Sequence, residues 1–136
     1  MPCPCGSKQL FHKCCKPYHD GTALPETAEK LMRSRFSAYA VKNADYIMDT
    51  THPSNPGWSD NRATWKEDIL RFCTLTQFVT LKVIDTADGA TPDEAFVEFH
   101  ATLTQLGKDA SFTERSKFLR VDGRWLYLAG VMEEES

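Results

Sequence analysis

The sequence predicts an α+β domain in which N-terminal helices pack on one face of a curved antiparallel sheet, with a small cysteine-rich segment in front. Three observations support this fold class. Apolar residues recur at helical spacing from residue 25 up to residue 74. After residue 74 they alternate with polar residues, as in half-buried strands. Four of the five cysteines lie within the first fifteen residues.

The cysteine-rich segment reads "CPCGSKQLFHKCC" and contains Cys3, Cys5, Cys14 and Cys15 in the pattern Cys-x-Cys-x8-Cys-Cys. Cys3 and Cys5 are separated by one residue, so in an extended segment their side chains point to the same side. Four thiolates around one ion form the closed tetrahedral site of structural zinc. The pattern therefore predicts one structural Zn²⁺ held by these four cysteines.

Three other uses of these thiols remain open: a disulfide pair, a copper–thiolate site and a redox centre. A cytoplasmic chain disfavours disulfides, and redox motifs usually space their thiols as Cys-x-x-Cys, which is absent here. Copper sites often use fewer thiolates, although affinity alone would not exclude them. His12 and His19 are possible substitute ligands if one cysteine stays out of the site.

Three helices are predicted before the sheet. The first covers residues 25–42, with apolar side chains at three- and four-residue spacing. A second, short helix starts at Asn43 or Asp45, and the prolines and glycine of "HPSNPG" end it. Ser59 or Asp60 then caps a third helix. The apolar side of that helix carries Trp65, Ile69, Phe72 and Cys73.

Four strands are predicted after the helices. The first alternates at Val79, Leu81 and Val83, and residues 109–121 and 124–131 form the third and fourth, joined by the hairpin signal "DG". Connections of a few residues favour antiparallel neighbours. The second strand carries a longer apolar set: Ala95, Val97, Phe99, Ala101 and Leu103.

The charge is unevenly spread along the chain. Residues 1–42 carry seven Lys/Arg and three Asp/Glu (+4), whereas residues 43–136 carry nine and sixteen (−7), which gives the net charge of −3. The basic front could steer the N-terminus toward an acidic or phosphate-rich partner, or it could simply solvate a helix. The isoelectric point near 5.8 argues against a broad nucleic-acid surface, although a small ribosomal contact stays possible.

The sequence lacks two kinds of segment that would indicate a location in a membrane or outside the cell. No apolar run approaches the ~18 residues of a membrane span, and no basic segment followed by an apolar stretch of ~7–15 residues indicates a secretory signal. We therefore expect a cytoplasmic protein that does not bind membranes.

The cysteine-rich segment resembles the SEC-C motif, the zinc-binding tail of the translocation ATPase SecA. This resemblance implies that Cys3, Cys5, Cys14 and Cys15 are the zinc ligands. Lys8 stands where the motif usually has Gly after Ser, and Lys16 stands where Gly often follows the last ligand. In SecA the motif contributes to contacts with other components, so the resemblance implies a docking role.

The segments "CPCGS…KCCKPYHDG", "TAEKLMRSRFSAYAVKNADYIMDTTHPSN" and "FTERSKFLRVDGRWLYLAG" together closely resemble the YchJ family of small bacterial proteins. The resemblance implies a SEC-C motif at residues 1–20 and a nuclear-transport-factor-2-like, cone-shaped domain at residues 21–136. It implies no particular reaction, because this fold hosts both enzymes and binding modules.

A cone-shaped domain of this kind often encloses a pocket between sheet and helices. Glu98 and His100 could be a neighbouring acid and base there, or they could belong to the solvated face of their strand. Glu114, between aromatic residues, could line the pocket or form a buried polar pair that holds Arg33 or Arg35.

Three more residues are possible pocket residues. His52 lies in the loop "TTHPSN", where functional residues concentrate, or it stabilises its own turn. Trp125 and Tyr127 alternate on the last strand and form core or pocket wall. No residue is predicted to be catalytic, because the chain has no phosphate loop, nucleophile elbow or dinucleotide fingerprint.

The sequence thus favours a zinc-binding interaction module that docks through its SEC-C motif onto a protein or ribosomal partner. The alternative is a small enzyme, an isomerase, dehydratase or hydrolase, that binds a small molecule in the pocket of the cone.

Overall fold

The computed structural model describes residues 1–131. Its helical elements are η1 (Phe11–Lys13), α1 (Lys16–His19), α2 (Ala28–Ala40), α3 (Ala44–Asp49) and α4 (Arg62–Leu75). Its strands are β1 (Thr76–Asp88), β2 (Glu94–Gln105), β3 (Lys108–Asp109), β4 (Phe112–Val121) and β5 (Arg124–Gly130). The sheet has the order β1-β2-β4-β5, with β3 paired to β2, and every pairing between these strands is antiparallel.

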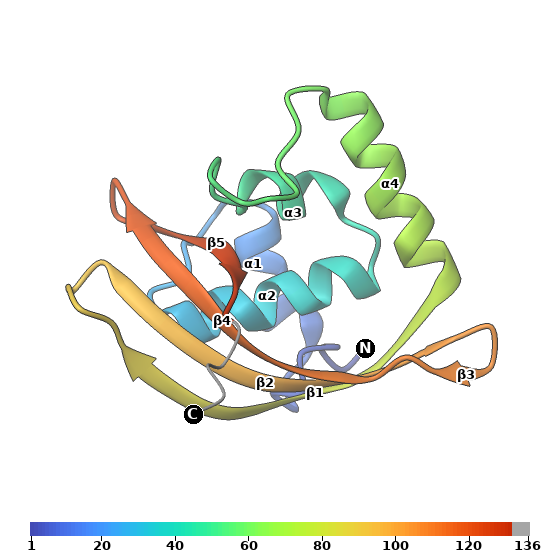
Figure 1. The fold of residues 1–136 in the computed structure, drawn as a ribbon. Coiled ribbons are helices and arrows are strands. Elements are labelled where there is room, and N and C mark those ends of the chain that lie inside the picture. Colours follow the sequence, from blue (N-terminus) through green and yellow to red (C-terminus); the bar gives the residue numbers. More distant parts are fainter. Residues whose placement is uncertain (132–136) are drawn as a thin grey trace, which may run out of the picture.

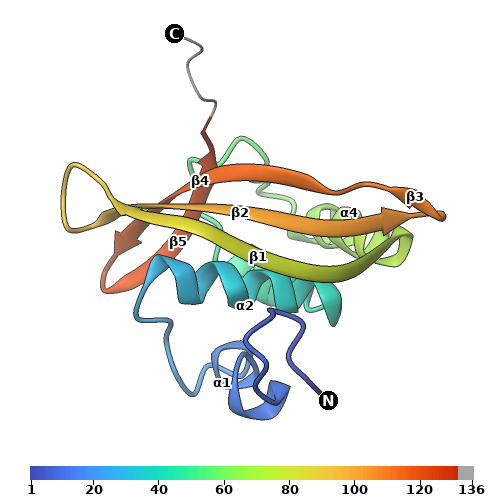
Figure 2. The same ribbon diagram turned by 90° about the horizontal axis from the view of Figure 1, so that it is seen from below.

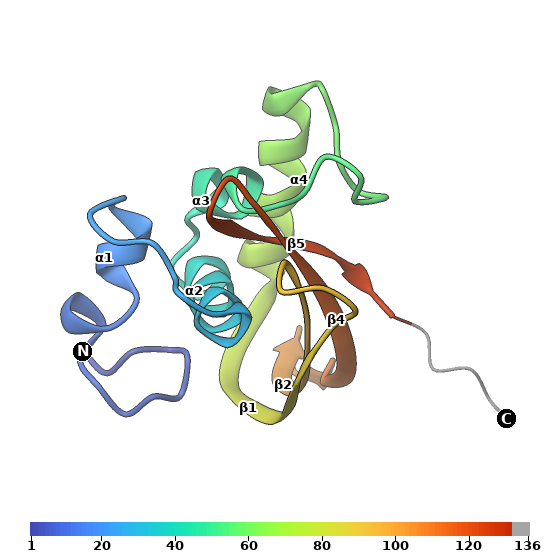
Figure 3. The same ribbon diagram turned by 90° about the vertical axis from the view of Figure 1, so that its left-hand side faces the viewer.

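The molecule has a curved sheet with helices on its concave side (Figure 1). Helix α2 lies across the concave face, between the sheet and the N-terminal segment, as two further views show (Figure 2, Figure 3). The core between α2 and the sheet includes Leu31, Phe36, Val97, Phe99 and Phe118. The predicted α+β class, with N-terminal helices packed on a curved antiparallel sheet, is confirmed.

Each of the three longer helices begins at a side-chain cap. Thr27 caps α2, Asn43 caps α3 and Asn61 caps α4, in each case by accepting an N–H from the first turn. The cap of α4 was predicted at Ser59 or Asp60. Ser59 instead accepts the backbone N–H of Asn61 and so belongs to the turn that leads into the helix.

The first strand departs from simple alternation. Val79 was expected to share the core face with Leu81 and Val83, but it is 58% exposed, whereas Leu81 is 4% exposed. The pairing of β1 with β2 shifts between Phe78 and Thr80. An irregularity at this point inserts an extra residue, which turns Val79 outward and leaves Phe78 and Leu81 on the inner side.

The second half of the sheet follows the predicted pattern more closely. Residues Asp122 and Gly123 form the two-residue turn of the β4–β5 hairpin, with φ angles of 51° and 79°. Both positive angles are those of a type I′ turn, which the "DG" signal predicts. The predicted strand 109–121 is divided, because β3 ends at Asp109 and β4 begins at Phe112.

The domain limits remain predictions. The boundary expected after residue 20 falls just beyond the short helix α1, which ends at His19. The expected C-terminal limit at residue 136 lies outside the described residues. Within residues 1–131, no helix has both the length and the apolar character required to cross a membrane.

Candidate functional site

The four cysteines predicted as metal ligands come together at the N-terminus. Their Sγ atoms all lie within 4.8 Å of one another. The Sγ of Cys5 lies 3.6 Å from that of Cys14, and the Sγ of Cys14 lies 3.9 Å from that of Cys15. Cys3, Cys5 and Cys15 are buried and Cys14 is partly buried. These four sulfurs could hold a metal ion.

The backbone of the segment closes the loop that brings the cysteines together. The N–H of Cys3 donates to the carbonyl of Gln9 at 2.8 Å, and the N–H of Phe11 donates to the carbonyl of Met1 at 2.9 Å. The turn between these two strands of the loop uses left-handed backbone at Gly6 (φ 82°) and Lys8 (φ 69°). The 3₁₀ turn η1 then leads directly to the second cysteine pair.

Protonation of the cluster is shared among its sulfurs. A hydrogen bond from the Cys15 thiol lowers the pKa of Cys5 to about 4. Burial raises the pKa of Cys14 to about 11, and the hydrogen bond to Cys5 raises the pKa of Cys15 as well. Hydrogen bonds within the cluster therefore stabilise a thiolate next to neighbouring thiols. A cation bound among the four would favour ionisation of the others, because thiolates, not thiols, bind metals.

Neither histidine of the segment belongs to this cluster. The Nε2 atom of His19 lies 2.8 Å from the carbonyl oxygen of Ser34, and its ring packs against Tyr46 with centroids 4.7 Å apart. Burial lowers the pKa of His19. His12 is exposed, and within residues 1–131 the group of side chains that could hold a metal ion contains cysteines only.

The N-terminal segment, residues 1–20, is called the knuckle below, and it is attached to the domain by polar contacts. The Sγ of Cys3 lies 3.3 Å from the Oγ of Ser37, which is fully buried on α2. One turn earlier, Arg33 donates from Nη1 to the carbonyl of Cys5 at 2.8 Å. The cysteine cluster is thus seated on α2.

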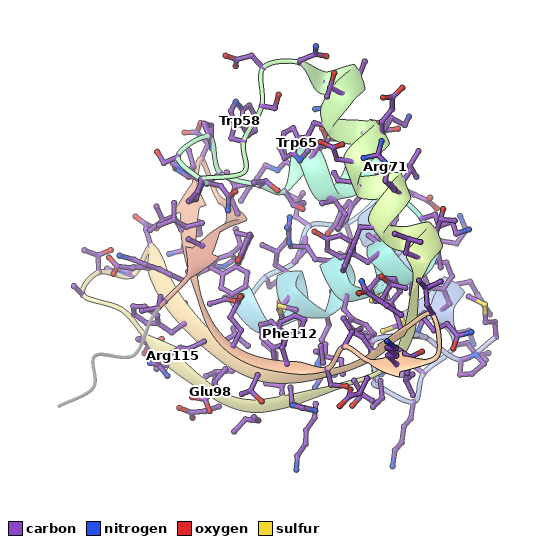
Figure 4. The ribbon with its side chains drawn as sticks, turned by 45° about the vertical axis from the view of Figure 1, so that its right-hand side comes forward. Trp58, Trp65, Arg71, Glu98, Phe112 and Arg115 are labelled. Carbon is purple, nitrogen blue, oxygen red and sulfur yellow. The ribbon has the colours of Figure 1, made fainter. Side chains whose placement is uncertain are left out.

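A second feature is a cavity of about 200 Å³ between α2, α4 and the inner face of the sheet. Its walls are mostly aromatic, with few polar groups. The aromatic residues that line it are Phe36, Tyr39, Phe72, Phe78, Phe99, Phe112 and Tyr127. Figure 4 shows Phe112 on the concave side of the sheet.

Arg35 supplies a buried cation to this cavity. Its side chain is on the inner side of α2, and the residue is 6% exposed. Its Nη1 atom donates to the carbonyl of Ile47 at 3.0 Å and to the hydroxyls of Thr50 at 2.8 Å and Thr51 at 3.1 Å. Desolvation lowers the pKa of Arg35, but a guanidinium remains protonated in proteins.

Glu114 supplies the matching carboxylate. Its Oε2 atom accepts the hydroxyl of Ser116 at 2.5 Å and that of Tyr127 at 3.2 Å. The guanidinium carbon of Arg35 lies 4.8 Å from the ring centroid of Tyr127. Burial raises the pKa of Tyr127 to about 12, so its hydroxyl stays a donor at neutral pH. Glu114 forms no salt bridge with Arg35; Arg33 instead pairs with Glu29 at 3.0 Å.

Two residues predicted for the pocket do not line this cavity, which corrects the prediction for them. Strand alternation puts Glu98 and His100 on the outer face of β2, the face opposite to Phe99 and Ala101. Glu98 lies 4.0 Å from Arg115, and Figure 4 shows both on the convex side of the sheet. The Nδ1 of His100 is 2.8 Å from the hydroxyl of Thr113. The acid–base pair of the enzyme alternative is therefore not formed in the cavity.

The other pocket candidates are divided. Glu114 and Tyr127 line the cavity. Trp125 is buried further along β5, where its Nε1 donates to the carbonyl of Glu26 at 3.2 Å. His52 does not line the cavity, and its Nδ1 accepts the N–H of Ser54 at 3.0 Å. It therefore stabilises its own turn, the second of the two interpretations of its loop.

Sequence reasoning named Arg35 only as a possible partner of Glu114 and missed its role as the cation of the cavity. A signal was present, because Arg35 follows Leu31 by four residues and so lies on the apolar side of the helix. An arginine on that side is buried when it finds acceptors, which Thr50 and Thr51 provide here.

Comparison with known proteins identifies the fold and the family. The family model described as "YchJ, middle NTF2-like domain" matches residues 27–130. A UPF0225 protein from Photorhabdus laumondii is 45% identical over 132 residues, which cover 95% of this chain and 79% of that protein. A UPF0225 protein from Yersinia pestis is 42% identical over 132 residues, covering 95% of this chain and 82% of that protein.

Two solved structures extend the similarity to the knuckle. A SEC-C motif containing protein from Rhodopseudomonas palustris has a TM-score of 0.82 and 32% identity, covering 98% of this chain and all of that one. A SEC-C motif containing protein from Psychrobacter arcticus has a TM-score of 0.79 and 25% identity, covering 99% and 85% of the two chains. A cysteine cluster fused to an NTF2-like domain, with relatives of this kind, establishes that the chain belongs to the YchJ family.

Proposed function

We propose that the four cysteines bind one Zn²⁺ ion in a structural site. A Zn–S bond of about 2.3 Å in a tetrahedron separates the sulfurs by about 3.8 Å. The distances Cys5–Cys14 and Cys14–Cys15, 3.6 and 3.9 Å, lie on either side of that value. Four thiolate ligands leave no open position, so the ion supplies folding free energy to a segment with almost no apolar core of its own.

We further propose that the knuckle is a docking module for an acidic protein surface or for ribosomal RNA. Residues 1–16 contain three lysines and no acidic residue, and Lys8, Lys13 and Lys16 are all exposed. Lys16 forms a salt bridge with Asp20 at 2.7 Å. Lys8 and Lys13 form none among residues 1–131, which leaves their charges available to a partner.

The observation that carries the docking proposal is the backbone of Lys8. Its φ of 69° is left-handed, which costs a residue with a Cβ roughly 1–2 kcal/mol. Glycine would avoid this cost and is the usual residue of the SEC-C pattern at this position. A lysine here gives the turn no backbone advantage over glycine, but it adds an exposed positive charge to the knuckle, which supports docking to an acidic partner.

This proposal includes a reducing, cytoplasmic location. Thiolate ligands must stay reduced to bind zinc, and closely spaced thiols are oxidised to disulfides in secretory compartments. The enzyme alternative loses its proposed acid–base pair, because Glu98 and His100 lie on the outer face of the sheet.

The test is affinity co-purification from host lysate with three variants of the full chain. Lys8→Gly/Lys13→Gln removes two charges and also relieves the strained backbone, so loss of binding cannot be attributed to a weakened knuckle. Cys14→Ser/Cys15→Ser removes two ligands. Lys82→Gln/Lys108→Gln removes two exposed charges from β1 and β3 and is the matched control.

We expect one zinc per chain, by elemental analysis, in the wild type and in both lysine variants, and little or none in the cysteine variant. We expect the same partner with the wild type and the control, and its loss in the other two. Nuclease treatment distinguishes a ribosomal from a protein partner. Zinc-free wild-type protein would contradict the metal site, and equal capture by Lys8→Gly/Lys13→Gln would contradict docking through the knuckle.

A further inference from the structure

We propose that the cavity between α2 and the sheet binds a small, uncharged aromatic molecule whose head group offers both a hydrogen-bond donor and an acceptor, such as a primary carboxamide. The aromatic walls would hold the ring. At the polar end, Arg35 and Glu114 would bind the acceptor and the donor of the head group. This site lies on the other side of α2 from the cysteine cluster, and the proposal does not depend on zinc or on docking.

The size and walls of the cavity fit one ring with a short substituent. Its volume is about 200 Å³, and an apolar cavity of about 150 Å³ is enough to hold benzene. Phe78 is the centre of an aromatic wall, with ring centroids 5.8 Å from those of Phe36 and Phe72 and 6.0 Å from that of Tyr39. Aromatic pairs at such distances attract one another, and a ligand ring gains the same contacts.

The mouth of the cavity leaves apolar surface in water. Phe72 of α4 is 38% exposed and Phe112 of β4 is 42% exposed, and both line the cavity. Phe112 points from the sheet toward the helices (Figure 4). A ring that enters between them would remove part of this surface from water, which is the main source of affinity for an apolar ligand.

Arg35 has hydrogen-bond donors that no described residue accepts. Among the residues that the structure describes, only its Nη1 atom donates hydrogen bonds to the protein. Among residues 1–131, no fully buried side-chain nitrogen or oxygen is without a hydrogen-bond partner. Its Nε and Nη2 atoms are therefore not fully enclosed, and Arg35 is a lining residue of the cavity. They are available to an acceptor on a ligand.

Glu114 likewise has an oxygen atom, Oε1, that accepts no hydrogen bond from the described residues. Ser116 and Tyr127 both donate to its Oε2 atom instead. Oε1 is likewise not fully enclosed. A Cβ atom added to Gly130 would come within 2.8 Å of Oε1, so the absence of a side chain at residue 130 makes room for the carboxylate.

The opposite charges of Arg35 and Glu114 determine which net charge on a ligand the cavity favours. One guanidinium and one carboxylate balance, so the polar end is neutral overall while it offers both donors and an acceptor. A carboxylate head would add a second negative charge beside Glu114, and an ammonium head would add a second positive charge beside Arg35. Either charge is costly to bury without a partner of its own. A neutral head that both donates and accepts satisfies both residues.

The test compares three probes that share one benzyl group: phenylacetamide, phenylacetate and 2-phenylethylamine. Each is titrated into the zinc-loaded full chain, and binding is followed by backbone amide chemical shifts. We expect phenylacetamide to bind with a dissociation constant below about 10 mM. Shifts should centre on β2, β4 and β5, and affinity should exceed that for either charged probe at least about tenfold.

Two carboxylate-to-amide variants make the test specific. Glu114→Gln keeps the shape of the side chain and an acceptor for Ser116 but removes the negative charge, so the preference should move toward phenylacetate by at least about tenfold. Glu98→Gln makes the same chemical change on the outer face of the sheet and should leave the order of affinities unchanged.

Ala101→Val tests the location by a different route. Ala101 lines the cavity, and two added methyl groups would reduce the space, so all three affinities should fall. If Glu114→Gln does not fold, Ala101→Val still tests the location of the ligand, and the order of affinities in the wild type still tests the preference for an uncharged head group. The proposal is wrong if no probe shifts cavity amides at about 10 mM, if phenylacetate binds the wild type best, or if Glu114→Gln leaves the order unchanged.

Discussion

The Cα atom of Gly6 lies against the main-chain carbonyl oxygen of Leu81, so closely that a Cβ atom on residue 6 would come within 2.8 Å of that oxygen. Gly6 belongs to the knuckle and Leu81 to β1. The contact joins the cysteine cluster to the edge of the sheet, in addition to its contacts with α2. Because the opposing atom is backbone, it cannot move aside as a flexible side chain would.

Gly6→Ala should therefore lower the free energy of unfolding by more than the cost of a left-handed backbone at alanine. Gly21→Ala is the matched control, because Gly21 has a φ of 78° against 82° at Gly6 but no atom within 4 Å of an added Cβ. Gly21→Ala should cost roughly 1–2 kcal/mol for the left-handed backbone. Gly6→Ala should cost clearly more, measured as the free energy of unfolding in urea, and equal losses would contradict the contact with Leu81.

Arg33→Gln should weaken the attachment of the knuckle to α2. Arg33 donates to the carbonyl of Cys5 at 2.8 Å and pairs with Glu29 at 3.0 Å. A hydrogen bond from a charged group contributes about 1.5–3 kcal/mol, and partial exposure of Arg33 reduces this to about 1 kcal/mol. Amide hydrogen exchange at residues 3–15 should accelerate about fivefold. Lys30→Gln, on the same helix with a salt bridge of 3.8 Å to Glu26, should leave that exchange unchanged.

Removal of the metal should unfold the knuckle and leave the sheet intact. The buried cysteines form a cluster separate from the core of α2 and the sheet, which includes Leu31, Val97 and Phe118. A metal ion held by the four cysteines would supply folding free energy to the cysteine cluster only. A chelator should abolish exchange protection at the amides of Cys3 and Cys14 while those of β2 and β4 keep theirs. Loss of protection throughout the chain would show that the two clusters unfold together.

Stability should fall at high pH because of buried tyrosines. Burial raises the pKa of Tyr46 from 10.0 to about 12, and its hydroxyl lies 2.7 Å from that of Ser34. The unfolded chain loses the tyrosine proton near pH 10 while the folded chain keeps it, so this stabilisation is complete below pH 10 and is lost as pH rises toward 12.

Urea unfolding between pH 9 and pH 12 measures this effect of Tyr46. One such tyrosine contributes a slope of about −1.4 kcal/mol per pH unit between the two pKa values. Tyr46→Phe, although less stable at neutral pH, should show a shallower decline over this range than the wild type. The same slope in both proteins would assign the decline to other groups.

Much of the fold follows from signals that are local in the sequence. The spacing of the four cysteines predicts a metal cluster because a short loop can bring two pairs together whatever surrounds it. The change of apolar period after residue 74 predicts helices followed by strands, and the turn at Asp122–Gly123 predicts the β4–β5 hairpin. Each of these depends on residues a few positions apart, whose preferences survive without the rest of the chain.

The interior of the cone, in contrast, was decided by tertiary structure. Val79 faces solvent because the pairing of β1 with β2 is irregular beside it, and no residue type within β1 indicates that irregularity. Arg35, Glu114 and Tyr127 share one cavity although they come from a helix and two strands. Their meeting depends on the curvature of the sheet and on how α2 packs across it. Sequence alone predicted most of the helices and strands and the clustering of the four cysteines. Packing between elements distant in the chain determined the cavity, since only that packing brings its charges together.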